Sequence, residues 1–345
     1  MSEIEQREPD QLDGVPLPEM QRRVVGHAEA RQGILGMLTA GRMPGGVLIH
    51  GPHGIGKATM AFDLARQIFA RTGDEHPHHI AEQVAAGGYP NLQVLRKAPR
   101  DSGKGYYTVI RVDEVRDLIE GLHRTRGRVG HRVVVVDPID DCNPSSANAL
   151  LKILEEPPPD TTFFLVSHRP GSLLPTIKSR CHSLALRPIS DADVRDVLLS
   201  VSPGENVDHA VELAGGRPRR GFEALLIGDE SALGALRNWL TNPSGPPPAA
   251  HIALADVLVA EKDGPQARFA REIVRDWVAG EARAAAADGP AARRRLASAT
   301  ELWDKADLMF AEADEYNLDP RQTLVAIFDA IRKHALLTAS PIEPR

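Results

Sequence analysis

The chain has 345 residues, of which 42% are apolar and 26% charged, and this globular composition excludes a largely disordered protein. Its formal net charge of -6 provides no global attraction to nucleic acid, so any DNA contact must come from local basic patches or from partners. The two cysteines, Cys142 and Cys181, are too few for a disulfide framework or a four-thiolate metal site, as expected of a reduced cytosolic protein.

The N-terminal segment, residues 1–20, is predicted to be a mobile arm, because it is acidic and contains prolines without apolar periodicity. It lacks the apolar core of a signal peptide, and no apolar run in the chain approaches the roughly 18 residues of a membrane span. We therefore expect a cytoplasmic protein that makes no membrane contact.

Residues 21–188 are predicted to form an α/β domain, because short apolar, β-branched runs alternate with helical patterns. This alternation indicates a parallel sheet that is covered by helices on both faces. The predicted strands are residues 46–50, 132–136, 162–166 and 182–186.

After residue 188 the patterns are helical only. Residues 189–230 are predicted to form a small helical domain, with a Gly215-Gly216 break before its last helix. In residues 231–340, beyond a Pro/Gly-rich segment at 242–248, apolar residues recur at a spacing of three to four and predict amphipathic helices.

Residues 51–57 read G-P-H-G-I-G-K and match the first seven positions of the phosphate-loop motif G-x-x-x-x-G-K-[ST]. The loop follows a predicted strand and precedes a predicted helix, as the motif requires. Gly51, Gly54 and Gly56 allow successive backbone N–H groups to surround an anion, and Lys57 reaches the terminal phosphates. The alternative is a Gly-rich turn that serves packing only.

Two groups needed for hydrolysis are missing from this site. Ala58 stands where the motif has a hydroxyl that ligates Mg²⁺, and Thr59 lies about 100° further round the helix. Asp137, which ends a predicted strand, is the carboxylate that ordinarily supports Mg²⁺, but Pro138 replaces the glutamate that orients water in ring ATPases of this type. The sequence argues against Mg²⁺ coordination and efficient hydrolysis, and leaves open whether the site holds ATP, ADP or no nucleotide.

Four further segments are in the order and spacing of a known family. They read A-N-A-L-L-K-I-L-E-E-P-P at 147–158, L-V-S-H-R-P at 165–170, L-L-P-T-I at 173–177 and S-R-C at 179–181. With the phosphate loop, they resemble the clamp-loader branch of the AAA+ ATPases, and within it the delta-prime family of bacterial DNA polymerase III. The resemblance is strong over residues 24–226, and beyond them only the helical character and a short echo at 317–322 agree.

The resemblance implies a P-loop AAA+ domain at 21–188, a helical lid domain at 189–230 and an all-α C-terminal collar at 231–340. It also implies a hetero-oligomer with gamma/tau and delta subunits, which loads a sliding clamp onto primed DNA during replication. In that assembly the chain would belong to a DNA polymerase holoenzyme without being an efficient ATPase itself.

Three polar residues acquire roles from the resemblance. Arg180, in Ser179-Arg180-Cys181, matches an arginine finger that reaches into the nucleotide site of the adjacent motor subunit; the alternative is an ion pair within its own domain. Ser167 matches the residue that senses the γ-phosphate, or else caps the next turn. Arg219 matches the second sensor arginine, or else belongs to a solvated basic edge or contacts a phosphate.

Residues 24–27, V-V-G-H, resemble the segment that borders the adenine ring in this family. Many delta-prime proteins carry a four-cysteine zinc module after the phosphate-loop helix, whereas residues 68–95 contain no cysteine. His76, His78 and His79 lack a fourth ligand and a rigid scaffold, so we expect a solvated loop there and no zinc.

Two rival functions follow from other features. An active motor ATPase of the gamma/tau type would need the groups that Ala58 and Pro138 replace. An autonomous DNA-binding protein would use a group of arginines, for which a surface turn is the alternative. These arginines are Arg116, Arg124, Arg126, Arg128 and Arg132.

Overall fold

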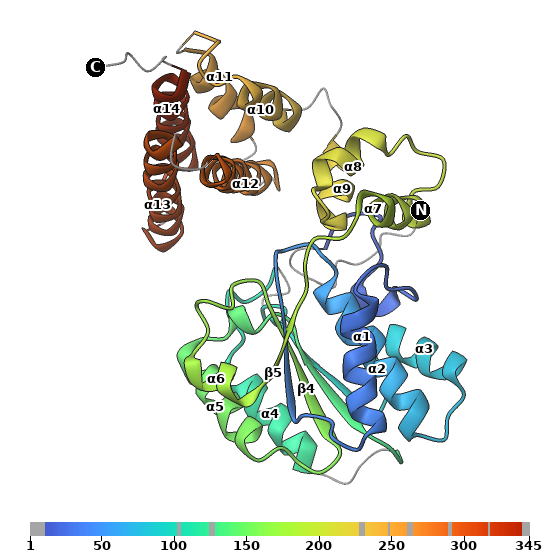
Figure 1. The fold of residues 1–345 in the computed structure, drawn as a ribbon. Helices are drawn as coiled ribbons and strands as arrows, with labels where there is room; N and C mark the ends of the chain where they lie inside the picture. Colours follow the sequence, from blue (N-terminus) through green and yellow to red (C-terminus); the bar gives the residue numbers. More distant parts are fainter. Residues whose placement is uncertain are drawn as a thin grey trace. The chain divides into compact units, whose positions relative to one another are not determined.

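The computed structural model divides into two compact units, Met1–Leu225 and Leu226–Arg345, which are described separately (Figure 1). The structure describes residues 11–101, 105–123, 128–227, 232–247, 249–260, 265–288, 292–316 and 318–339. Arg124, Arg126 and the Asn317 that begins the echo at 317–322 lie outside the described residues.

The first unit is built on a five-stranded sheet in the order β2-β3-β4-β1-β5. All four strand pairings are parallel, so the predicted parallel sheet is confirmed. The short edge strand β2 was not predicted, because its sequence L-Q-V-L has neither a β-branched run nor a clear alternation. The strands are β1 (Gly46–His50), β2 (Leu92–Leu95), β3 (Arg132–Val136), β4 (Thr161–Ser167) and β5 (His182–Ala185).

Each central strand sends alternate side chains to opposite faces of the sheet, and both faces are buried. On β1, for example, Val47 and Ile49 belong to one core cluster and Leu48 to the other. Helices α1, α2 and α3 cover the first face, and α4, α5 and α6 cover the second, as Figure 1 shows. Their bounds are α1 (Ala28–Thr39), α2 (Lys57–Thr72), α3 (Pro77–Ala85), α4 (Val112–His123), α5 (Pro144–Glu155) and α6 (Pro175–Arg180).

Three helices follow β5 in the same unit, α7 (Asp191–Val201), α8 (Asp208–Ala214) and α9 (Pro218–Ile227). The predicted break lies between α8 and α9. Gly216 has a φ of +73°, and a Cβ there would lie 2.6 Å from the carbonyl oxygen of Ile189, so only glycine fits. The chain can therefore turn back tightly onto the end of the sheet domain.

Residues 11–20 are packed, which corrects the predicted arm for this part of it. Leu12 and Leu17 are only 7% and 2% exposed, and a short 3₁₀ helix (η1) spans Pro18–Met20. Arg66 on α2 donates to the carbonyl oxygens of Glu19 and Gln21, at 3.1 and 2.7 Å. The prediction missed this because isolated apolar residues in a Pro-rich segment carry no periodic signal. Residues 1–10 lie outside the described residues.

The second unit contains helices α10 to α14, as its periodicity predicted. Phe269, Ile273, Val274 and Phe328 are all buried, and Trp239 packs its ring 5.1 Å from that of Phe328. The helices are α10 (Ala232–Thr241), α11 (Ala249–Leu258), α12 (Pro265–Ala287), α13 (Arg293–Tyr316) and α14 (Pro320–Ala339). Among the described residues, none of the helices combines the length and the apolar character needed to cross a bilayer.

Candidate functional site

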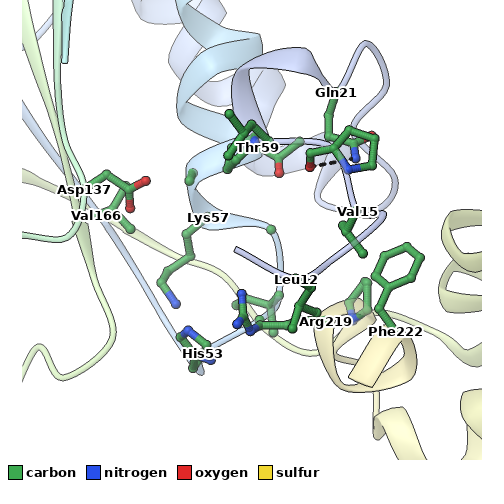
Figure 2. Close-up of a pocket in the computed structure, with 18 of the residues that line it drawn as sticks. Leu12, Val15, Gln21, His53, Lys57, Thr59, Asp137, Val166, Arg219 and Phe222 are labelled. Atoms are coloured by element: carbon green, nitrogen blue, oxygen red, sulfur yellow. Dashed lines mark hydrogen bonds between the residues drawn. The ribbon is translucent and has the colours of Figure 1, made fainter. Parts of the chain in front are cut away.

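A pocket of about 360 Å³ opens at the carboxyl ends of the parallel strands, where ligands bind in open α/β sheets (Figure 2). It is lined by the phosphate loop, the N-terminal segment 11–27, residues at the ends of β2, β3 and β4, Ile189 and Val197, and the start of α9. Residues 24–27 contribute Val24, Val25 and His27, so the segment that resembles an adenine border does lie at the pocket.

The phosphate loop connects β1 to α2 through three glycines in the left-handed region. Gly51, Gly54 and Gly56 have φ values of 147°, 82° and 89°. A Cβ on Gly51 would lie 2.4 Å from the carbonyl oxygen of Leu186, whereas the space beside Gly56 is open. One side of the loop therefore packs against Leu186, the residue after β5, and the other side is accessible. Phosphate binding by backbone N–H groups requires such an open side.

Lys57 is the buried cation of this loop, with only 3% of its surface exposed. Its Nζ donates to the carbonyl oxygens of Gly51 and Pro52, at 2.8 and 2.7 Å. Burial lowers the pKa of Lys57 to about 8, and the nearby carboxylates of Asp137 and Asp140 oppose this shift. A bound phosphate would replace the two carbonyls as the partner of the ammonium and favour its charged form.

Asp137, at the end of β3, pairs with an arginine that the sequence analysis did not single out. The Nη2 of Arg96 lies 3.4 Å from the Oδ2 of Asp137. Ala58 lines the pocket without an oxygen in its side chain, and Thr59, which also lines the pocket, lies apart from the Lys57 ammonium in Figure 2. Mg²⁺ requires oxygen ligands in near-octahedral geometry, so these residues do not fit it.

Ser167 ends β4, is fully buried and does not itself line the pocket. Its hydroxyl donates to the Oδ1 of Asp140 at 3.0 Å, and the backbone N–H groups of His168 and Arg169 donate to the same carboxylate. Ser167 therefore does not face the pocket. The turn after β4 is capped by the carboxylate of Asp140 and not by Ser167. A carboxylate with three donors is a weak candidate for a general base.

Arg219 stands in the first turn of α9 and lines the pocket next to the phosphate loop (Figure 2). Its backbone N–H donates to the carbonyl oxygen of Gly54 at 3.2 Å, and its Nε donates to Glu223 at 2.9 Å. The helical part thus contributes an arginine side chain to the pocket. The alternative of a solvated basic edge does not describe Arg219, whose side chain is only 18% exposed.

Arg180 is the last residue of α6, and its guanidinium folds back onto its own domain. It pairs with Glu155 at the end of α5 at 2.5 Å and donates to the carbonyl oxygen of Thr176 at 3.0 Å. This is the intradomain ion pair that the sequence analysis named as the alternative. The side chain stays 34% exposed, so a partner could reach it.

The two residues that flank Arg180 have structural roles. Ser179 donates its hydroxyl to Thr176, which stabilises the end of α6. Cys181 packs against β1, where a Cβ on Gly46 would lie 2.9 Å from its Sγ. Burial raises the pKa of the Cys181 thiol to about 11, so it is a packing residue and not a nucleophile.

The three histidines after α2 are exposed to solvent, as expected, but they lie at the start of a helix and not in a loop. His76 is the N-cap of α3 and accepts from the N–H of His78 at 3.2 Å, with Pro77 in the first turn. The signal for this helix start, a polar residue followed by proline, was present in the sequence. Within the described residues, no group of three or more His, Cys, Asp or Glu is arranged to hold a metal ion.

The arginines proposed for DNA binding are occupied within the fold. Arg116 pairs with Asp113 at 3.0 Å and Arg128 with Glu75 at 2.8 Å. Arg132 is buried on β3 and donates to the carbonyl oxygen of Leu122. Among the described members of the group, none presents an unshielded cation for a phosphate backbone, which disfavours this rival.

Sequence reasoning missed several residues that line the pocket. They come from segments distant in the chain, and no motif marks them. They are Leu12, Val15, Arg96, Lys97 and Phe222. The position of Arg96 directly after a strand, on the carboxyl edge of the sheet, is the signal that could have identified it, had β2 been predicted.

Comparison with known proteins agrees with this architecture. The family described as "DNA polymerase III, delta subunit" matches residues 26–190. DNA polymerase III subunit delta' of Pseudomonas aeruginosa is 39% identical over 178 residues, covering 50% of this chain and 52% of the relative. The Yersinia pestis subunit delta' is 34% identical, covering 43% of each chain.

A gamma/tau subunit of Mycobacterium bovis is 29% identical over 63% of this chain and 38% of the relative. The chain thus spans about half the length of the curated delta' relatives that it matches. The family match covers the phosphate loop, the sheet and the S-R-C segment in one piece. Over about half of its length, the chain is thus similar to DNA polymerase III subunits of the delta' type.

Proposed function

We propose that this chain is the delta-prime subunit of a bacterial clamp loader and that it completes the ATP site of a neighbouring subunit with Arg180. The observation that carries the proposal is the position of Arg180, a partly exposed guanidinium at the end of α6, in a domain whose own site is degenerate. A planar, permanently charged guanidinium supplied in trans stabilises the charge that develops on a transferring phosphoryl group.

The ion pair with Glu155 does not prevent such a role. Both side chains are partly exposed, 34% for Arg180 and 50% for Glu155, and ion pairs of this kind contribute about 0–1 kcal/mol. The triphosphate of a neighbour carries a larger negative charge than one carboxylate. Arg180 can therefore leave Glu155 for a phosphate at small cost when the neighbour docks.

The chain's own pocket is proposed to bind ATP or ADP without efficient hydrolysis. The glycine loop, Lys57 and Arg219 supply phosphate and lid contacts. A water-activating base is not in place, because Pro138 follows Asp137 and because Asp140 already accepts three hydrogen bonds. The rival function of an active gamma/tau-type motor is disfavoured for the same reasons.

In the proposed assembly the chain is one member of a hetero-oligomer with gamma/tau and delta subunits in the cytoplasm. The helices of the second unit would join a collar with the neighbouring subunits. ATP binding by the motor subunits would hold the sliding clamp open, and hydrolysis on primed DNA would release it.

The test is reconstitution of the complex with Arg180→Ala. We expect normal assembly and a loss of DNA-stimulated hydrolysis at the adjacent site of about 10³-fold, the usual scale for a trans arginine. Lys178→Ala is the matched control, since it removes an exposed cation from the same helix. ATP turnover by the Arg180→Ala complex equal to that of the control would refute the finger, and failure of the chain to assemble with gamma/tau and delta would refute the clamp-loader role.

A further inference from the structure

Arg96 stands beside Asp137 because of the register of two strands. β2 and β3 are parallel with Leu95 paired to Val136, so the next residue of each strand emerges at the same edge. The N–H of Asp137 donates to the carbonyl oxygen of Leu95 at 3.0 Å, which extends the ladder to this point. The guanidinium is therefore placed by the sheet itself and not by a mobile loop.

The side chains of Glu19, Asp137 and Phe62 hold the Arg96 side chain in the pocket wall. Nη1 and Nη2 contact the two carboxylate oxygens of Glu19, at 3.0 and 3.1 Å, in the bidentate geometry that arginine favours. Nη2 also contacts Asp137 at 3.4 Å, and the guanidinium lies 5.3 Å from the ring centre of Phe62. With 17% of the side chain exposed, Arg96 is a fixed cation at the pocket.

Each carboxylate near the phosphate loop is already neutralised or saturated. Asp137 has Arg96, Asp141 pairs with Lys97 at 2.8 Å, and Asp140 accepts from three donors. Ala58 adds no oxygen. A divalent cation would find no hydroxyl at position 58 and would have to displace Arg96 from Asp137.

We infer that this pocket binds a nucleoside di- or triphosphate as the metal-free anion, with Arg96 neutralising Asp137 where active sites of this fold use Mg²⁺. The inference rests on the proposed function insofar as the pocket is taken to bind nucleotide. Its physical basis is that an unpaired Asp137 would repel the phosphates held by Lys57, and Arg96 reduces that repulsion without a metal, although its charge is shared with Glu19. A magnesium-bound nucleotide would instead bring a second cation against the Arg96 guanidinium.

The direct test is calorimetric titration of the purified full chain with ADP and with ATP, in EDTA and in excess MgCl₂. We expect binding in EDTA and an affinity at least about tenfold weaker in excess MgCl₂, because magnesium withdraws the metal-free nucleotide that the pocket binds. Lys57→Ala should abolish binding in EDTA and thereby locate it at this pocket. Binding in EDTA that is no tighter than in MgCl₂, or no binding in either condition, would overturn the inference.

Variants of the charge pair sharpen the test. Arg96→Met should weaken binding in EDTA by about tenfold or more, and MgCl₂ should restore it in part because Asp137 is then free. Arg96→Met combined with Asp137→Asn should restore metal-free binding to within about threefold, because the repelling carboxylate is gone. Arg96→Lys, which keeps the charge, should bind as the parent does in EDTA. An unchanged affinity of Arg96→Met in EDTA would contradict the proposal.

Glu19→Gln is the matched control, because it loosens the contact between Arg96 and residues 11–21 without removing the Arg96 charge. It weakens the bidentate contact that ties this segment to Arg96 but leaves the cation beside Asp137. It should bind metal-free nucleotide at least as tightly as the parent. If it loses affinity as Arg96→Met does, the effect comes from the loosened segment, and the inference fails. The reconstitution assay with Arg180→Ala does not involve this pocket, so the two proposals can fail separately.

Discussion

Arg219 in the first turn of α9 lies directly on Gly54 of the phosphate loop. The Arg219 N–H donates to the Gly54 carbonyl oxygen at 3.2 Å, and a Cβ on Gly54 would lie 2.7 Å from the Arg219 Cβ. The helical part and the phosphate loop therefore meet through a glycine that tolerates no side chain. Any change in the loop on nucleotide binding acts on α9 through this contact.

Gly54→Ala should destabilise the protein by more than a glycine change elsewhere with the same backbone. Both Gly54 and Gly87 have positive φ, at 82° and 71°, so alanine costs about 1–2 kcal/mol at either position. Only Gly54 adds a steric clash, since nothing lies within 4 Å of a Cβ on Gly87. Urea unfolding of Gly54→Ala and Gly87→Ala measures the difference, and equal losses would show that Arg219 yields freely.

The affinity for ADP should fall as the pH rises above about 8. Burial lowers the pKa of Lys57 to about 8, and phosphate binding needs the ammonium, so each pH unit above this value should weaken binding by up to about tenfold. Titration calorimetry between pH 7 and about 9.5 measures this. A flat profile would show that Lys57 does not contact the phosphates.

Stability should change in the opposite direction over the same window. The unfolded chain keeps the Lys57 proton up to its ordinary pKa of 10.5, whereas the folded chain releases it near 8. Between these values the unfolded state binds more protons, so the free energy of unfolding rises with pH, by up to about 3 kcal/mol from this group. The difference between the parent and Lys57→Met isolates this contribution.

Ser167→Ala should reduce stability without reducing nucleotide affinity. The buried hydroxyl donates to Asp140 and does not line the pocket, so its loss should cost about 1 kcal/mol in unfolding free energy. Asp140→Asn should cost about 1.5–3 kcal/mol, because the charge that three donors share is removed. A tenfold loss of ADP affinity in Ser167→Ala would instead restore the γ-phosphate sensor role.

Glu155→Gln should leave the reconstituted complex at least as active as the parent. Arg180 must leave Glu155 to reach a neighbour, so weakening that pair should raise DNA-stimulated hydrolysis by up to about fivefold, the equivalent of 1 kcal/mol. Assembly should be unaffected. A fall in rate like that of Arg180→Ala would mean that Glu155 positions the guanidinium for the neighbour and does not compete for it.

The sheet and the phosphate loop could be predicted because their signals are local. Buried parallel strands such as β3 and β4 are continuous apolar runs, and the loop's glycines and Lys57 are contiguous in the sequence. The edge strand β2 could not, because it is only four residues long and Gln93 interrupts the apolar run that identifies a buried strand.

The charge pairs of the site depend on contacts between distant segments. Arg96 and Asp137 are 41 residues apart, and Arg96 and Glu19 are 77 apart, so no window of sequence contains either pair. An ion pair between Arg180 and its own domain was one of the two alternatives predicted from the sequence. The identity of its partner, Glu155, could not be predicted, because the contact depends on how α5 and α6 pack. Residue types predicted the chemistry of the pocket, and the fold decided which groups neutralise one another.

The packing of Leu12 and Leu17 and the two arginine anchors at residues 19–21 bear on how the protein is prepared. A fragment that begins near residue 21, a natural choice from the apolar pattern, would lack one wall of the pocket and the bidentate partner of Arg96. Binding assays on such a trimmed protein would report on a pocket that lacks one wall and in which Arg96 has lost its partner Glu19. Purification tags are better fused to the other end of the chain.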